Sequence, residues 1–173
     1  IIPCYNEEKT VETIYVAITD TMDMLPQYDY EILFVNDGSK DNTLNKLTGL
    51  SEMDVHVKYY SFSRNFGKEA AIYAGLTNAR GDYVVTMDAD MQDPPALLIR
   101  RISDADIVDG ARDFRMMTRD MVNSVLALSE YNRFSKGIFG WVGYRTKWLE
   151  YENIERSAGE TKWSFWKLFV YSL

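Results

Sequence analysis

Two aspartates, Asp88 and Asp90, follow directly after residues 83–87, an apolar run (YVVTM) typical of a short buried strand. Gln92 adds a neutral side-chain oxygen two residues later. Such hard oxygen ligands suit Mg²⁺ or Mn²⁺, and Mg²⁺ is usually shared with substrate phosphates because protein alone rarely encloses it. The three side chains therefore predict a site for a metal ion and a phosphorylated substrate. The alternative is that both aspartates are only turn and capping residues.

Two further polar loops, residues 3–8 and 36–39, also follow predicted strands. Ligands of open α/β sheets bind outside the carboxyl ends of the strands, so three loops far apart in the sequence are expected to converge on one crevice. Asp37 is suited to hydrogen-bonding a ribose or a base, and Tyr5 could stack on a base. Lys68 lies near the same edge, although it could equally be the solvated start of a helix. Each loop taken alone is no more than a turn.

Cationic side chains recur in the second half of the chain. Asp113 is flanked by Arg112 and Arg115, and nearby positive charge favours the ionised form of a carboxyl group. The other cations considered are Arg133, Lys136, Arg156, Lys162 and Lys167. A guanidinium fork fits phosphate oxygens, which makes the arginines candidates for phosphate binding. The alternative is an ordinary surface with ion pairs.

The composition argues against several other classes of protein. The net charge of −7 disfavours a nucleic-acid-binding protein, because phosphate backbones need a basic surface. His56 is the single histidine and no nucleophile elbow accompanies it, which disfavours a Ser-His-Asp triad. Cys4 is the single cysteine, so neither an intrachain disulfide nor a cysteine zinc site is expected. The sequence has no glycine-rich loop of the P-loop or dinucleotide type.

The elements that must position these residues alternate between strands and helices, which predicts βαβ units and a mostly parallel sheet in one domain. The predicted strands are residues 1–2, 30–35, 55–62 and 83–87. The predicted helices are residues 8–24, a helix that Ser39 or Asp41 caps, and residues 68–79, 94–101 and 119–128. Residues 134–148 are predicted as strand and loop. The apolar side of the first helix consists of Val11, Ile14, Ile18 and Met22.

One junction and the end of the chain depart from this pattern. The predicted helix ending near Arg101 passes directly into residues 102–106, where a further strand and a longer connection are expected. A segment is therefore predicted to be missing near residues 101–102. Residues 163–173 (WSFWKLFVYSL) suit an amphipathic helix at a lipid interface, or alternatively a core helix or a lead into a missing partner. No run of about 18 apolar residues is present, so no segment of this chain is expected to span a bilayer. The abrupt ends predict a piece of a longer protein.

Eight motifs, in this order, resemble those of family 2 glycosyltransferases with the GT-A fold. They are IIPCYNEE, FVNDGSKDNT, SRNFGKEAA, GDYVVTMDADMQDPP, RDFRMM, NRF, GIFGWVGY and RSAGETKW. They most resemble the branch that charges polyprenyl phosphates, with bactoprenol glucosyltransferase and dolichyl-phosphate mannose synthase. The resemblance implies a Rossmann-like α/β domain with a mixed, mostly parallel sheet over residues 1–150. Residues 151–173 would form the acceptor entrance and the start of an amphipathic interface helix.

The resemblance also implies roles for individual residues. The nucleotide sugar would be bound by Pro3, Tyr5, Asn6, Glu7, Val35, Asp37, Lys68, Asp88, Ala89 and Asp90. Mg²⁺ or Mn²⁺ would be held by Asp88, Asp90 and Gln92. The catalytic residues would be Asp113, Arg115 and Arg133. The acceptor phosphate would meet Arg115, Arg133, Arg156 and Lys162.

We therefore expect inverting transfer of a hexose from a UDP-glucose or GDP-mannose type of donor to an undecaprenyl or dolichyl phosphate. The reaction would take place at the cytoplasmic face of a membrane, such as the bacterial inner membrane, with anchoring by parts outside this chain. One alternative is transfer to a saccharide hydroxyl in polysaccharide synthesis, where Asp113 would be a general base. Another is a nucleotide-sugar-binding module without turnover. The sequence leaves open whether the protein forms a homo-oligomer.

Overall fold

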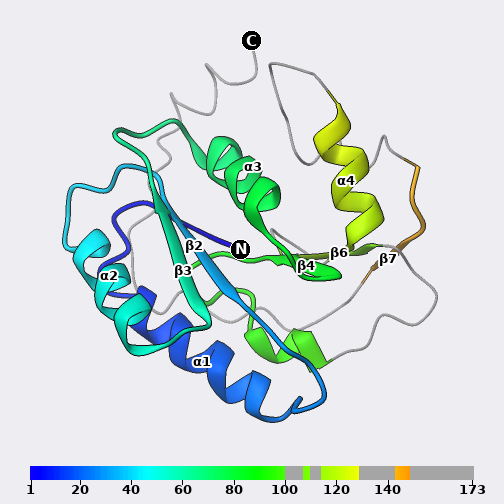
Figure 1. Ribbon diagram of the computed structural model, residues 1–173, viewed down its shortest axis with the longest axis horizontal. Helices are drawn as coiled ribbons and strands as arrows, with labels where there is room; N and C mark the ends of the chain where they lie inside the picture. Colours follow the sequence, from blue (N-terminus) through cyan, green and yellow to red (C-terminus); the bar gives the residue numbers. More distant parts are fainter. Residues whose placement is uncertain (100–106, 110–113, 129–142, 149–173) are drawn as a thin grey trace.

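The computed structural model describes residues 1–99, 107–109, 114–128 and 143–148 (Figure 1). A parallel sheet has the strand order β1-β2-β3, with β1 at Ile2–Cys4, β2 at Ile32–Asn36 and β3 at Val57–Ser61. A second sheet has the order β4-β6-β5-β7. Its strands are β4 (Tyr83–Thr86), β5 (Ile107–Asp109), β6 (Arg115–Thr118) and β7 (Thr146–Trp148).

The two sheets are joined through the start of the chain. The Ile1 nitrogen donates to the Val85 carbonyl (2.6 Å), and the Met87 amide donates to the Ile1 carbonyl (3.1 Å). Ile1 is thus bonded to both Val85 and Met87, two residues apart on the neighbouring segment. This is the hydrogen-bond pattern of parallel strands. The chain therefore continues from β1 to β4 in parallel, and the carboxyl ends of β1, β2, β3 and β4 lie at one edge.

Helices cover both faces of this sheet (Figure 1). One face of the sheet is covered by α1 (Val11–Asp23), α2 (Thr43–Met53) and the 3₁₀ helix η1 (Pro95–Ile99). The other face carries α3 (Lys68–Asn78) and α4 (Arg119–Ala127). Each face has its own apolar core, centred on Phe34 and Ile14 on the first side and on Met117 and Met121 on the second.

The predicted α/β class and the mixed sheet are confirmed. The pairs β1–β2, β2–β3 and β5–β7 are parallel, whereas β4–β6 and β5–β6 are antiparallel. The predicted apolar side of the first helix is also confirmed, since Val11, Ile14 and Ile18 are buried and Met22 packs against the same core. None of the helices in the described residues is long and apolar enough to cross a membrane.

Several predicted boundaries were wrong. The strand predicted to start at residue 55 starts at Val57, because Val55 is 88% exposed. The helix predicted for residues 94–101 is a 3₁₀ helix of five residues. The prediction missed β5 and β6 altogether. Of residues 134–148, the structure describes only 143–148, which contain β7.

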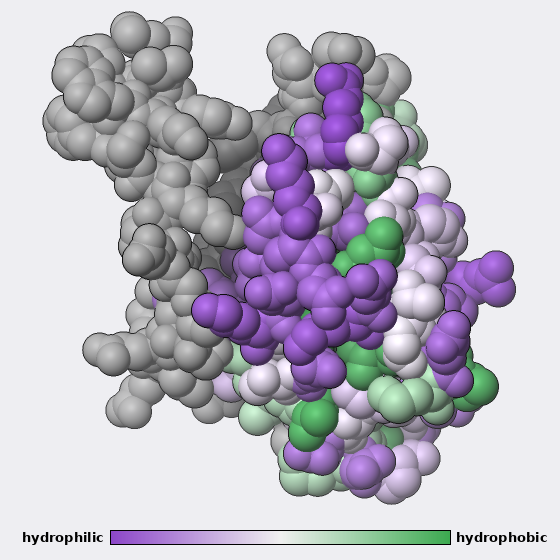
Figure 2. All heavy atoms as spheres, turned by 90° about the vertical axis from the view of Figure 1, so that its left-hand side faces the viewer, coloured by the Kyte–Doolittle hydropathy of each residue, from purple (hydrophilic) through white to green (hydrophobic). Residues whose placement is uncertain are grey.

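The side of the molecule that carries α2 and the edge strand β3 is largely hydrophilic (Figure 2). On β3, Lys58, Tyr60 and Ser61 are exposed, whereas Val57 is buried and Tyr59 is half-buried. The apolar residues of α2, Leu47 and Leu50, turn inward to the core. A polar edge of this kind discourages the pairing of β3 with a further strand.

Candidate active site

The loops that follow β1 and β2 are tied together by reciprocal hydrogen bonds. The backbone amide of Asn6 donates to Ser39 Oγ (2.9 Å), and the backbone amide of Lys40 donates to the Asn6 side-chain oxygen Oδ1 (2.8 Å). Asn6 has a φ of 56°, a left-handed conformation that asparagine tolerates better than most residues. The side chain of Asn6, a residue predicted to bind the nucleotide, thus fixes the neighbouring loop.

A second pair of hydrogen bonds repeats this arrangement two residues later. The backbone amide of Glu8 donates to Asp41 Oδ2 (3.1 Å), and the backbone amide of Asn42 donates to Glu8 Oε2 (2.9 Å). Asp41 Oδ1 also accepts from the Thr43 amide (3.0 Å) at the start of α2. Burial alone would raise the pKa of the Asp41 carboxyl, but hydrogen bonds from Thr43 and from the Glu8 amide outweigh it and hold that pKa below its ordinary value.

Asp41→Asn is expected to lower the free energy of unfolding by about 1–2 kcal/mol at neutral pH, because a neutral amide is a weaker acceptor than a carboxylate. The folded-state pKa of Asp41 is lowered, so the ionised carboxylate stabilises the fold above the unfolded-state pKa of about 4. This contribution is lost as the pH falls through the folded-state pKa. Urea unfolding at a series of pH values should show the variant and wild type converging in acid.

The exposed Asp29 provides a control for this prediction. Asp29→Asn should change the free energy of unfolding little at any pH. The free energy of unfolding of Asp41→Asn could also stay below that of the wild type by the same amount from neutral pH down to acid. This result would show that the charge of Asp41 has no part in holding the loops.

Asp37 joins three segments at the carboxyl end of β2. Its amide donates to the Cys4 carbonyl (2.8 Å), while its carboxylate accepts from the Phe66 amide (2.7 Å) and from the Gly67 amide (2.9 Å). The residue is 3% exposed. The structure therefore uses the Asp37 carboxylate to hold the loop between β3 and α3, in addition to any contact that it makes with a ribose or base.

Gly38 lets this loop approach closely. Its φ is +65°, and a Cβ added there would lie 2.3 Å from the Arg64 carbonyl carbon. Only glycine adopts this conformation without strain and leaves room for the neighbouring backbone. The loops after β2 and β3 consequently lie side by side at the upper left of Figure 1.

The β4 loop meets this assembly through an ion pair. Lys68, the first residue of α3, places its Nζ 2.5 Å from Asp88 Oδ1. Asp88 and Asp90 are half-buried and flank Ala89, which is buried. The backbone amide of Gln92 donates to Asp90 Oδ1 (3.2 Å). Met91, which lies between them, has a φ of 63°. The structure thus brings together the four loops in which most of the predicted nucleotide and metal residues lie.

The donor chemistry of the β4 loop fits a hard divalent cation. Asp88 and Asp90 supply carboxylate oxygens and Gln92 supplies an amide oxygen, all from one short turn. Within the described part of the chain, no group of three or more His, Cys, Asp or Glu side chains is arranged to hold a metal. Few protein ligands are expected of a site in which Mg²⁺ or Mn²⁺ keeps positions for substrate phosphates.

Other predicted site residues are placed around this edge. Pro3 and Val35 are partners in the β1–β2 register, where Val35 is fully buried and Pro3 is half-buried. Tyr5 is half-buried, and Glu7 accepts a hydrogen bond from the Thr10 hydroxyl (2.8 Å). The nucleotide contacts of these residues stay predictions.

Arg115 is buried at the start of β6 and is 7% exposed. The strand register sets it opposite Thr86, two residues before Asp88. This cation therefore lies at the same edge as the β4 loop. The other predicted catalytic and acceptor residues lie outside the described residues; they are Asp113, Arg133, Arg156 and Lys162.

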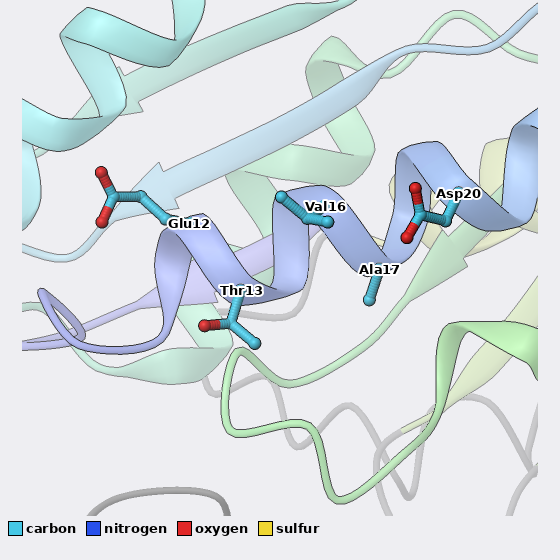
Figure 3. A pocket seen from close by; sticks show the side chains of 5 residues that line it. All are labelled: Glu12, Thr13, Val16, Ala17 and Asp20. Carbon is cyan, nitrogen blue, oxygen red and sulfur yellow. The ribbon is translucent and has the colours of Figure 1, made fainter.

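A shallow pocket runs along α1 (Figure 3). It is lined by Glu12, Thr13, Val16, Ala17 and Asp20. All five come from one helix, and none of the four loops contributes to it. The site is therefore defined by the hydrogen bonds and the ion pair of the loops, not by this hollow.

Residues 1–148 match the model of the family described as Glycosyl transferase family 2. The chain belongs to glycosyltransferase family 2. This family 2 glycosyltransferase is 41% identical to the putative glycosyltransferase CsbB of Bacillus subtilis, in an alignment that covers all of the chain and 64% of CsbB. It is 35% identical to the prophage bactoprenol glucosyl transferase homolog of Escherichia coli, covering all of the chain and 69% of that protein. The chain spans about two thirds of the length of these relatives.

The alignment with CsbB runs over 210 positions, whereas this glycosyltransferase has 173 residues, so 210 less 173, or 37, positions have no counterpart in it.

Two solved structures show the same fold at low identity. The mannosyltransferase PcManGT of Pyrobaculum calidifontis, in complex with GDP-Man and Mn2+, has a TM-score of 0.58 at 16% identity over 84% of this chain and 52% of that chain. S. aureus TarS 1-349 in complex with UDP-GlcNAc has a TM-score of 0.56 at 17% identity over 92% and 58%. The fold is GT-A, as predicted.

Proposed function

We propose that this domain transfers a hexose from a nucleotide diphosphate sugar to a polyprenyl phosphate, with inversion at the anomeric carbon and with Mg²⁺ or Mn²⁺ as cofactor. The observation that carries the proposal is the convergence of the Asp88–Gln92 turn, Lys68 and the loops anchored by Asp37 at one sheet edge. Relatives named as bactoprenol glucosyl transferases support a lipid phosphate acceptor. Solved neighbours named with GDP-Man and Mn2+ or with UDP-GlcNAc support the donor class and a divalent cation.

The residues at this edge would divide the work as follows. Asp88, Asp90 and Gln92 would hold the metal ion, which supplies Lewis-acid stabilisation of the charge on the leaving diphosphate. Lys68 and Arg115 would add positive charge near the phosphates. Tyr5, which lies just past the end of β1 and two residues after the stiff Pro3, would lie against the base.

The acceptor decides whether a general base is needed. A phosphate acceptor is already anionic at neutral pH, so its oxygen can attack the anomeric carbon without first losing a proton. Asp113 would then orient the sugar or a neighbouring cation. With a hydroxyl acceptor, by contrast, Asp113 would have to accept a proton.

A lipid acceptor also sets where the reaction takes place. We propose that the site faces a membrane surface, on the cytoplasmic side of the bacterial inner membrane. Arg156 and Lys162 would meet the lipid phosphate, and residues 163–173 would begin an interface helix. We further propose that the catalytic domain comprises residues 1–150, and that the absent positions of the CsbB alignment fall near residues 101–102.

Radiolabelled nucleotide sugars mixed with polyprenyl phosphate and Mn²⁺ test the proposal. Label should pass into organic solvent with one donor, and the same donor should raise the unfolding temperature only when Mn²⁺ is present. Label that enters only a water-soluble saccharide would favour the hydroxyl-transferring alternative. Binding without release of nucleoside diphosphate, whatever the acceptor, would favour a module without turnover.

A further inference from the structure

The ion pair between Lys68 and Asp88 occupies part of the proposed metal and diphosphate site. Lys68 Nζ lies 2.5 Å from Asp88 Oδ1, and the two side chains are 41% and 26% exposed. An ion pair that is this open can be reached by a ligand from solvent. A cation of the protein itself therefore lies at a carboxylate that the proposed function assigns to a bound divalent cation.

The backbone that carries Lys68 is held in place. The amides of Phe66 and Gly67, the two residues before it, both donate to the buried Asp37 carboxylate. Lys68 itself starts α3, which packs against β1 and β2. These contacts restrain the backbone, whereas the flexible four-carbon stem of the lysine can redirect the ammonium without moving the loop.

We propose that Lys68 is a resident counter-ion that leaves Asp88 when the donor diphosphate binds with its divalent cation, and that it then pairs with an oxygen of the diphosphate. The proposal rests on the proposed function. The physical reason is repulsion, because an ammonium and a divalent cation cannot both lie against Asp88 at low cost. The diphosphate supplies the negative charge that the displaced ammonium needs.

Opposite effects on two ligands follow from this exchange. With Lys68 paired, the formal charge of Asp88, Asp90 and Lys68 together is −1; without Lys68 it is −2. A metal ion alone should then bind less well to the wild type than to a protein without the lysine charge. A nucleoside diphosphate with its metal should bind better to the wild type. Lys68 would thereby couple the metal to the nucleotide and disfavour loading of the metal alone.

Lys68→Met tests the exchange, and Lys58→Met is a matched control. Lys58 makes an ion pair of similar length and exposure with Glu31, at 2.6 Å and with side chains 47% and 19% exposed, but it lies on β3 outside the site. Binding of Mn²⁺ alone would be measured by electron paramagnetic resonance. Binding of UDP and of GDP at saturating Mn²⁺ would be measured by calorimetry.

Lys68→Met is expected to bind Mn²⁺ alone about fivefold more tightly and the preferred nucleoside diphosphate about tenfold or more weakly. Lys58→Met should match the wild type in both measurements, and Lys68→Arg should retain most of the wild-type coupling because it keeps the charge. Melting temperatures of all variants would identify any loss of folding, in which case Lys68→Gln replaces Lys68→Met.

Other results would overturn the exchange. Weaker binding of both ligands to Lys68→Met would mean that the ion pair only supports the loop structure. Weaker nucleotide binding with unchanged Mn²⁺ binding would make Lys68 a simple phosphate ligand. Unchanged binding of both would remove Lys68 from the site. If the wild type bound no Mn²⁺ even with UDP or GDP present, the metal-dependent function itself would fall, and the exchange with it.

Discussion

Asp90→Asn is expected to lower the rate of sugar transfer by about a hundredfold to a thousandfold at saturating Mn²⁺, the range observed when one electrostatic contact to a developing charge is removed. Asparagine has nearly the same size as aspartate, and its amide oxygen can still accept the hydrogen bond from the Gln92 amide. The turn should therefore persist while one negatively charged oxygen ligand is lost. Initial rates of label transfer across a range of Mn²⁺ concentrations would measure the loss.

Asp82→Asn is the matched control, because Asp82 is exposed just before β4 and therefore at the opposite end of that strand from the turn. This variant should transfer sugar at the wild-type rate. Should Asp90→Asn keep full activity at every Mn²⁺ concentration, the assignment of Asp90 as a metal ligand would be wrong. A partial loss that high Mn²⁺ restores would instead indicate a weakened but still functional site.

Gly38→Ala is expected to lower the free energy of unfolding by about 2–4 kcal/mol, a large effect for the addition of one methyl group. Gly38 combines a φ of +65° with a position at which a Cβ would lie 2.3 Å from backbone of Arg64. Backbone cannot move aside as the end of a flexible side chain can, so the loop between β3 and α3 has to shift. Urea unfolding measures the stability, and calorimetry with UDP or GDP should show weaker binding because Lys68 moves with that loop.

Gly49→Ala makes the same chemical change without these constraints. Gly49 lies inside α2, and a Cβ added there has no atom within 4 Å. Alanine is a better helix former than glycine, so this variant should gain up to about 1 kcal/mol. If Gly38→Ala and Gly49→Ala unfold at the same urea concentration, the close approach of the two loops does not contribute to stability.

The convergence of polar loops at one edge could be predicted from sequence because it depends on topology alone. Parallel strands that alternate with helices place the residues after each strand at the same end. Asp88 and Asp90 could be recognised because an apolar strand runs directly into them. The ion pair of Asp88 with Lys68 at 2.5 Å agrees with this reasoning.

The partners of the loop side chains could not be predicted in the same way. The sequence predicts that Asp37 contacts a ribose or base, but it does not predict that the carboxylate accepts from backbone amides 29 and 30 residues further along the chain. No local pattern reveals a partner at that separation. Ser39 or Asp41 was predicted to cap α2, but the N-cap residue is Asn42, which makes no side-chain cap hydrogen bond. Asp41, one residue earlier, accepts from the first amide of the helix, at Thr43.

Strand β6 was missed for another reason. Its four residues, Arg115–Thr118, begin with an arginine and show no apolar–polar alternation. The first three are buried, because β6 lies between β4 and β5. Arg115 thus looked like part of a charged surface segment, although it is nearly inaccessible. Interior strands are recognised by length and composition, and this strand is too short to show either.

Reciprocal hydrogen bonds link the loop after β1 to the loop after β2, and they have a consequence for protein engineering. Asn6 is bonded to Ser39 and Lys40, and Glu8 is bonded to Asp41 and Asn42. Each loop supplies donors and acceptors that only the other loop completes. A chimera that receives the loop after β1 from a relative with another donor preference would leave the loop after β2 without its partners. The two loops should therefore be replaced together. A chimera designed to change the donor preference has to exchange both residues 5–8 and residues 39–43.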